Sequence, residues 1–272
     1  MTPEQQTHPT VAHLLRSAQA YCDQIAERET LQYGIAWHSK RFADLPEANQ
    51  VREVVVENPS QLGDAFEEFE SFYRDRGLSF HKWTPAGGMP SNDMSSFLLE
   101  RGFVPVEHAA FALAEWVDVD VSQGIRIVPA RAMRAALRRT LEMEYETTDP
   151  AVRALLLDAR LERLDDPKLD EFVAMKGNEP VGHCALFEVG DIARVMGLFA
   201  RDASGDRAVE RALLAHILAL AKRLVIRNIC TLVEESADTD DDLLRAVGFQ
   251  RVGSIVEFVR ERGQMTVRDV AP

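Results

Sequence analysis

The sequence predicts an α/β protein built from two related units, and three observations lead to this prediction. Segments with apolar residues at three- and four-residue steps, typical of amphipathic helices, alternate with short runs rich in β-branched residues, typical of strands. One order of elements occurs twice: a strand, a long helix, a strand, a short helix, Gly-Phe and a strand, at residues 51–116 and again at 192–260. At roughly 100–200 residues per domain, a chain of 272 residues is also long enough for two domains.

The first half is expected to begin with a long helix, because an apolar stripe runs from Val11 to Ile25. Asn58-Pro59 ends the first β-branched run, and Gly77 follows the second helical stripe where a C-terminal cap is expected. The expected elements are helices at 10–28, 60–76 and 93–101 and strands at 51–56, 79–84 and 104–116.

The second half is expected to contain a hairpin at Gly177-Asn178, a dipeptide favoured in tight turns. The expected strands lie at 125–128, 172–176, 181–189, 192–200, 229–234 and 252–260, and the helices at 130–144, 150–164, 206–224 and 240–247. Such alternation can arise by chance, but Gly102-Phe103 and Gly248-Phe249 stand at matching places and favour two copies of one unit. A turn-rich acidic stretch at 116–124 separates the expected domains, 1–118 and 125–263, and a loose tail follows at 264–272.

Composition excludes several classes of protein. With 46% hydrophobic and 28% charged residues, the chain is an ordinary globular one. Its net charge of −13 disfavours nucleic acid and anionic membrane as partners. Cys22, Cys184 and Cys230 lie in no metal or redox spacing, so we interpret them as reduced packing residues and expect no metal site. No secretory signal and no run of 18 apolar residues is found, which predicts a cytoplasmic protein without a membrane span.

Residues 198–214, LFARDASGDRAVERALL, resemble a segment of the GNAT superfamily of N-acetyltransferases. In that family a strand leads into the loop Arg/Gln-x-x-Gly-x-Gly/Ala and then into a helix that begins Ala-Leu-Leu. Gly205, Ala208 and Glu210 fall on the three motif positions, and only Ala208 keeps a small residue in the expected role. The order of elements from 125 to 260 is also similar. The resemblance implies two tandem GNAT-like units, each a mixed, mainly antiparallel sheet flanked by helices, with an incomplete or degenerate N-terminal copy.

The resemblance implies that the second unit binds acetyl-CoA or another acyl-CoA. Free N–H groups and the dipole at a helix N-terminus attract the pyrophosphate of coenzyme A. Glu210 opposes this attraction by about 1 kcal/mol if solvated. The alternative is that Arg201, Arg207, Arg211 and the neighbouring carboxylates form a solvated helix start. The implied cofactor-binding residues are Leu198, Phe199, Ala200, Arg201, Gly205, Asp206, Arg207, Ala208, Val209 and Glu210.

Catalytic groups are harder to assign. The family usually places a proton-donating Tyr four residues before the Gly of Gly-Phe, where this chain has Leu98 in the first half and Leu244 in the second. The candidate general bases are Glu188, Glu234 and His183, and the alternative is that the two glutamates are surface residues and the histidine is structural.

Two functions therefore remain open. The first is an N-acetyltransferase, or acyltransferase, that transfers the acyl group directly to a small amine. The second is a non-catalytic GNAT-like module that works through protein contacts or weak ligand binding. In the family the acceptor pocket is formed around the region that corresponds to residues 130–164, where Glu144 and Tyr145 either face the pocket or end a solvated helix. No acceptor and no oligomeric state is predicted.

Overall fold

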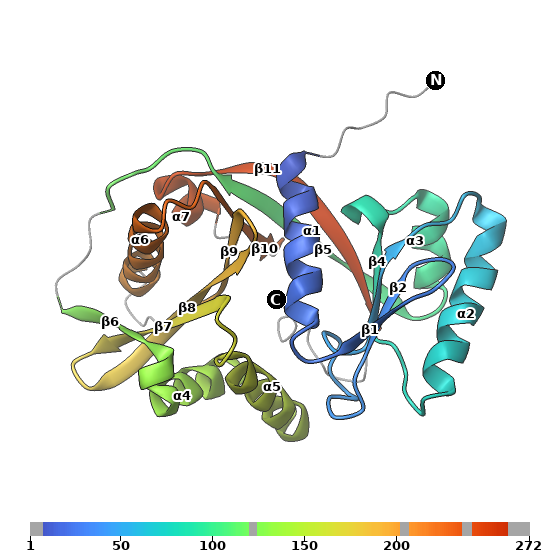
Figure 1. Ribbon diagram of the computed structural model, residues 1–272, viewed down its shortest axis with the longest axis horizontal. Helices are drawn as coiled ribbons and strands as arrows, with labels where there is room; N and C mark the ends of the chain where they lie inside the picture. Colours follow the sequence, from blue (N-terminus) through green and yellow to red (C-terminus); the bar gives the residue numbers. More distant parts are fainter. Residues whose placement is uncertain (1–7, 120–123, 202–206, 236–240, 261–272) are drawn as a thin grey trace. The chain divides into compact units, whose positions relative to one another are not determined.

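The structure, a computed structural model, describes residues 8–119, 124–201, 207–235 and 241–260 (Figure 1). These residues form two compact units. Unit 1 contains the described residues of Met1–Ala110 and of Val252–Ala271, and unit 2 contains those of Phe111–Arg251. Two strands, β5 (Phe103–Leu113) and β11 (Phe249–Arg260), have residues in both units.

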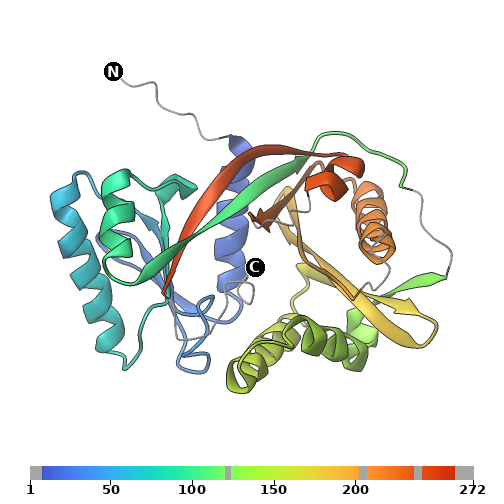
Figure 2. The same cartoon turned by 180° about the vertical axis from the view of Figure 1, so that it is seen from behind.

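Unit 1 has a sheet with the strand order β1-β2-β3-β4-β11-β5. Pairing is parallel between β3 and β4 and antiparallel in β1–β2, β2–β3 and β4–β11. Helix α1 covers one face, and α2 and α3 cover the other (Figures 1 and 2). The elements are α1 (Pro9–Cys22), β1 (Glu27–Thr30), β2 (Ile35–His38), β3 (Gln50–Val54), the 3₁₀ turn η1 (Pro59–Gln61), α2 (Leu62–Arg74), β4 (Lys82–Pro85), the 3₁₀ turn η2 (Ala86–Gly88) and α3 (Asn92–Leu99).

Unit 2 has a sheet with the order β10-β9-β8-β7-β6, in which only β9 and β10 form a parallel pair among the registers of these five strands. Helices α4 and α5 lie along one face, and α6 lies along the other with α7 beside it (Figures 1 and 2). The elements are β6 (Ile125–Pro129), the 3₁₀ turn η3 (Ala130–Ala132), α4 (Arg134–Glu144), α5 (Pro150–Arg163), β7 (Leu169–Lys176), β8 (Glu179–Val189), β9 (Ile192–Ala200), α6 (Ala208–Arg223), β10 (Asn228–Glu234) and α7 (Asp241–Ala246).

The expected fold class, a mixed and mainly antiparallel sheet flanked by helices, is confirmed. Each expected helix and strand is present, with ends shifted by a few residues. The expected first helix at 10–28 is too long, because α1 ends at Cys22 and residues 27–30 form β1. All four residues of β1 are exposed, so this strand has no apolar alternation by which it could have been found. In the described part of the chain, no helix is long and apolar enough to cross a bilayer.

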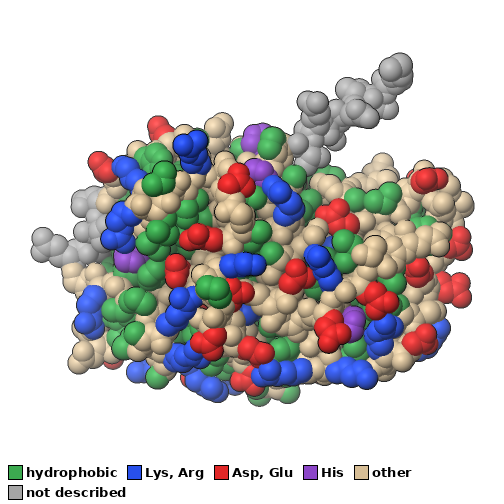
Figure 3. Space-filling view, viewed as in Figure 1, with side chains coloured by type: hydrophobic (Ala, Val, Ile, Leu, Met, Phe, Trp, Pro, Cys, Tyr) green, Lys and Arg blue, Asp and Glu red, His purple; other side chains and the backbone are tan. Residues whose placement is uncertain are grey.

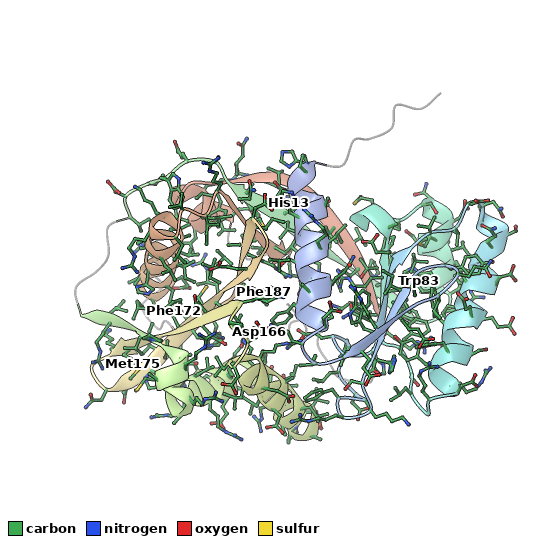
Figure 4. All side chains as sticks on the ribbon, viewed as in Figure 1. His13, Trp83, Asp166, Phe172, Met175 and Phe187 are labelled. Carbon is green, nitrogen blue, oxygen red and sulfur yellow. The ribbon has the colours of Figure 1, made fainter. Side chains whose placement is uncertain are left out.

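The division of the chain differs from the expected domains 1–118 and 125–263, because residues 252–260 belong to unit 1. Phe258 and Val259 pair with Trp83 and Lys82 of β4, and Phe258 lies in the aromatic core of unit 1 around Trp83 (Figure 4). The last strand therefore completes the sheet of the first unit rather than that of the unit that precedes it in the sequence. The expected tail, 264–272, lies outside the described residues.

A buried group of charges joins four neighbouring strands of unit 1. Glu257 on β11 lies 2.9 Å from Lys82 Nζ and 3.0 Å from Arg52 Nη2, accepts a hydrogen bond from Thr84 Oγ1 at 3.3 Å and lies 3.5 Å from His108 Nε2. The side chains of both ion pairs are at most 4% exposed. Burial raises the pKa of Glu257, but Lys82 and Arg52 outweigh burial and hold this pKa well below its ordinary value. The carboxylate is therefore ionised in the folded unit and offsets part of the positive charge of Lys82 and Arg52.

We expect Glu257→Gln to lower the free energy of unfolding by about 3 kcal/mol or more, because it leaves buried cations without their carboxylate. The loss is measured by urea unfolding at pH 7. The control Glu29→Gln removes a partly exposed ion pair with Arg76 and should cost less than about 1 kcal/mol. Similar losses in the two variants would contradict this interpretation of the buried group.

The pKa of Glu257 is lower in the folded chain than in the unfolded chain, where about 4.3 is ordinary for Glu. Its stabilisation is therefore present above the ordinary pKa and is lost as the pH falls through the folded-state value. We expect the stability of the wild type to drop below about pH 5 and that of Glu257→Gln to drop less steeply, as measured by urea midpoints at successive pH values. Parallel curves would show that another carboxylate dominates acid unfolding.

Candidate functional site

The parallel strands β9 and β10 separate part of the way along their length. Their paired residues end at Val195 and Thr231, but β9 continues to Ala200 and β10 to Glu234. Residues 196–200 of β9 and 232–234 of β10, here termed the wedge, therefore have no partner across this edge in the register of the two strands. Backbone N–H and C=O groups along such an edge need partners from elsewhere.

A bulge in β9 lies where the separation begins. His183 and Ala185 of β8 pair with Phe199 and Met196 of β9, so β9 has one more residue than β8 between these two pairs. Within this bulge Gly197 has a φ of +60°. A Cβ at Gly197 would lie 2.5 Å from Nη2 of Arg160. Glycine is thus required twice, for its backbone conformation and for the close approach of the guanidinium.

Helix α6 begins just after the wedge, and its start carries two opposite charges. Arg207 is the N-cap residue in a left-handed conformation (φ 55°, ψ 29°), with no capping hydrogen bond from its side chain. Glu210 in the first turn is 13% exposed, and its Oε1 lies 3.4 Å from Nε of Arg207. Its other oxygen, Oε2, is buried without a hydrogen-bond partner among the described residues. The acidic residue in the motif is thus partly neutralised by the neighbouring arginine.

The expected cofactor-binding residues fall on three segments. Leu198, Phe199 and Ala200 lie in the wedge, and Arg207 and the next three residues open α6. Val209 is buried where α6 meets the sheet, and a Cβ at Gly182 would lie 2.9 Å from its Cγ1. Gly205 and Asp206 are outside the described residues, and Arg201 directly follows β9. The described members thus border one region, between the end of β9 and the start of α6.

The three candidate bases lie at different places along the sheet. His183 pairs with Phe199 in the wedge, whereas Glu188 pairs with Ala193, six residues or about 20 Å away along β9. Partial burial and then Asp170 raise the pKa of Glu188. Glu234 is the last residue of β10, at its wedge end. The structure therefore brings His183 and Glu234 to the wedge and leaves Glu188 at the opposite end of the sheet.

His183 has polar neighbours that sequence reasoning did not connect with it. It is 0% exposed, its Nδ1 lies 2.9 Å from Oγ1 of Thr140, and its Nε2 lies 3.2 Å from Oε2 of Glu144. Thr140 and Glu144 are four residues apart on α4 and so share a face of the helix. That spacing was visible in the sequence, but nothing there showed that this face meets β8.

A second buried polar pair supports the bulge. Arg160 of α5 holds Glu171 of β7 through contacts of 2.9–3.2 Å, and Glu171 is 2% exposed. The slot of the family's acid, Leu244, is apolar and buried. Within the described ranges, no group of three or more His, Cys, Asp or Glu side chains is arranged to hold a metal ion.

A cavity of about 490 Å³ in unit 2 lies apart from the wedge, between β6, α6 and residues 116–119. His216 lines it and packs edge-on against Phe172, which is labelled in Figure 4, with ring centroids 4.6 Å apart. On the face seen in Figure 3, acidic and basic side chains are interspersed. The wedge, rather than this cavity, is where the expected cofactor-binding residues gather.

Unit 1 has the same order of elements, but its corresponding strands stay paired. After an irregularity at Glu53, whose φ is +55°, pairing between β3 and β4 resumes at Val54 and Pro85. In front of α2, Oε1 of Gln61 accepts hydrogen bonds from the backbone N–H groups of Glu57 and Asn58. The described part of unit 1 therefore shows a closed strand pair where unit 2 has its wedge.

Known structures with a similar fold include N-acetyltransferases, although no match was found by sequence. No protein-family model and no curated protein sequence matches the chain. A GCN5-related N-acetyltransferase from Kribbella flavida is similar with a TM-score of 0.67 and 11% identity over 94% of this chain and 97% of that one. A second, from Sphaerobacter thermophilus, has a TM-score of 0.60 and 16% identity over 87% and 83%.

A conserved protein of unknown function from Staphylococcus epidermidis has a TM-score of 0.69 and 12% identity over 88% of this chain and 95% of that one. Identities this low establish similarity of fold and not of activity. The wedge, the bulge and the helix that follows them are thus found in a chain that has the fold of the GCN5-related N-acetyltransferase (GNAT) superfamily.

Proposed function

We propose that unit 2 is an acyl-CoA-dependent N-acyltransferase that uses acetyl-CoA or another acyl-CoA. The observation that carries this proposal is the strand pair opened by the bulge at Gly197 directly before the start of α6. The pantetheine arm of coenzyme A contains two amides, whose donors and acceptors match the unpaired backbone edge of a strand. Two proteins of similar fold are described as GCN5-related N-acetyltransferases, and we propose the same class of reaction for unit 2.

The residues present fit this ligand along its length. Backbone groups of Leu198 and Ala200, on the edge of β9 that faces away from β8, would hold the pantetheine amides, while Phe199 between them pairs with His183 of β8. The first N–H groups of α6 would hold the pyrophosphate. Arg207 adds a guanidinium suited to phosphate. Glu210 stands where the family has Gly or Ala, and its negative charge would weaken phosphate binding at this end of the site. Arg201, Gly205, Asp206, Ala208 and Val209 complete the proposed set.

The bound acyl-CoA would supply an activated acyl group, and the protein would supply position and a proton acceptor. A thiol has a pKa of about 8.5, so the sulfur can leave as a thiolate without an acid at the slot of Leu244. The acceptor would enter on the side of α4 and α5. The proton acceptors near the wedge are His183 and Glu234, whereas Glu188 lies too far away unless the sheet rearranges.

A second candidate function, a non-catalytic GNAT-like module, is favoured by the acidic start of α6 and by the apolar Leu244. Release of free thiol from acetyl-CoA in the presence of a panel of primary amines distinguishes the two. Amine-dependent release supports the transferase, and binding without release supports the module.

The other proposals concern the whole chain. We propose that unit 1 is a degenerate GNAT-like copy without its own cofactor site, that the acceptor is a small amine, and that the protein is cytoplasmic. The closed pairing of β3 and β4 supports the first of these. The three cysteines are free and buried, as is usual in a reducing compartment, which supports the last.

Calorimetric titration with acetyl-CoA should show one micromolar site per chain, and Gly197→Ala should weaken it by about tenfold or more, roughly 1.4 kcal/mol. The added Cβ meets the guanidinium of Arg160 and a positive φ, so either Arg160, which is held by Glu171, or β9 must shift. Gly190→Ala is the matched control, because Gly190 also has a positive φ, +64°, but has open space around its Cβ position. Both variants are first compared by thermal unfolding. Equal affinities in the two variants, or two sites per chain, would exclude the wedge as the single site.

Glu210→Gln should tighten acetyl-CoA binding by about fivefold, since it removes roughly 1 kcal/mol of repulsion from the phosphate end. The control Asp158→Asn removes the same charge from an exposed position on α5. The same titration measures both variants. An affinity unchanged by Glu210→Gln would mean that the start of α6 does not face the pyrophosphate.

A further inference from the structure

The contacts of His183 determine which of its ring nitrogens carries hydrogen. Oγ1 of Thr140 donates its proton to the carbonyl of Leu137 at 2.8 Å. That bond leaves the hydroxyl lone pairs for His183, which favours Nδ1 of His183 as the donor in their 2.9 Å contact. The other nitrogen, Nε2, lies 3.2 Å from Oε2 of the Glu144 carboxylate.

Nε2 and the carboxylate of Glu144 have one place for a proton between them. When Nδ1 holds the hydrogen of a neutral ring, Nε2 has only a lone pair to present to Oε2, 3.2 Å away. Both atoms are buried and neither has a hydrogen-bond partner among the described residues, so their contact is one of distance alone. A proton that arrives at this place changes a contact between two acceptors into a charge-assisted hydrogen bond.

The surroundings leave Glu144 as the charged group that faces His183. On the sheet, Val173 of β7 and Phe199 of β9 lie opposite His183, and both are uncharged. Glu171, two residues along β7 from Val173, is paired with Arg160 of α5. From α4, Thr140 and Glu144 provide the polar contacts.

His183 and Glu144 lie between the wedge and solvent. The rings of His183 and Phe199 have centroids 5.5 Å apart, and Phe199 belongs to the wedge. His183 is fully buried, whereas the side chain of Glu144 is 25% exposed. Glu144 is thus placed to meet an acceptor molecule on the side of α4, with His183 behind it.

We propose that Glu144 is the proton acceptor for the attacking amine and that His183, fixed by Thr140, is its positioning partner. This inference rests on the proposed acyltransferase function. The amine nitrogen forms a bond to the acyl carbon, the C–S bond breaks, and its electron pair leaves with sulfur as a thiolate. The proton released by the amine moves to the exposed edge of the Glu144 carboxylate, whose buried oxygen Oε2 lies 3.2 Å from Nε2 of His183. It then leaves to solvent through the exposed edge of Glu144.

The first test needs no substrate. Long-range ¹H–¹⁵N correlation spectra of the full chain report which ring nitrogen of each histidine is protonated, and the spectrum of His183→Gln assigns the signal. We expect neutral His183 to carry hydrogen on Nδ1 in the wild type. In Thr140→Val, which keeps the side-chain shape but removes the acceptor, we expect the hydrogen to move to Nε2 and donate to Glu144. An Nε2–H ring in both proteins would overturn the inference.

The second test measures thiol release from acetyl-CoA with the best amine of the panel, between pH 6 and 9. We expect Glu144→Gln to lower kcat by about 100-fold, in the range of general-base effects, with little change in KM for acetyl-CoA, and to change the pH dependence of kcat. The control Glu142→Gln lies on the same helix and removes an exposed pair with Arg138, so it should behave as the wild type.

The outcomes separate this inference from the proposed function. If the wild type transfers the acyl group and Glu144→Gln has the same rate and pH profile, the proposed role of Glu144 is wrong and the proposed transferase function is retained. A wild type that binds acetyl-CoA but transfers nothing would overturn both, whatever the spectra show. Thermal unfolding of each variant shows whether a loss of rate is a loss of fold.

Discussion

The site depends on where two parallel strands stop pairing. β9 and β10 share a ladder as far as Val195 and Thr231, and the bulge at Gly197 follows immediately. The extra residue at the bulge turns the strand and interrupts its ladder, so the remaining edge of β9 keeps its hydrogen-bonding groups for a ligand. Arg160 lies against the glycine and is itself held by Glu171, so a buried ion pair supports the geometry of the bulge.

Unit 1 has the same order of elements, but its parallel strands β3 and β4 resume pairing after their irregularity, unlike β9 and β10 of unit 2. Its irregularity at Glu53 lies in the corresponding strand, but β3 and β4 pair again at Val54 and Pro85. The interior of its sheet carries Glu257 in ion pairs with Lys82 and Arg52. Buried ion pairs within the sheet and closed strand pairing are features of a structural unit, which is the role that we propose for it.

The two ends of the proposed site use charge differently. At the start of α6, Arg207 and Glu210 form a partly exposed pair, so a phosphate bound as proposed would compete with the carboxylate for the arginine. On the side of α4, Glu144 faces a buried histidine and keeps one place for a proton. An anionic carrier at one end and a proton acceptor at the other are what transfer to an amine requires.

The sequence by itself determined the kinds and order of nearly all helices and strands, because apolar periodicity and turn residues act locally. It also indicated the part of β9 that enters the wedge, since residues 198–214 carry a strand-loop-helix pattern. It did not show that residues 252–260 join unit 1, that Glu188 lies far from Phe199, or that Glu144 meets His183. Those facts depend on strand register and on which helix face meets the sheet, and only contacts between residues distant in the chain decide them.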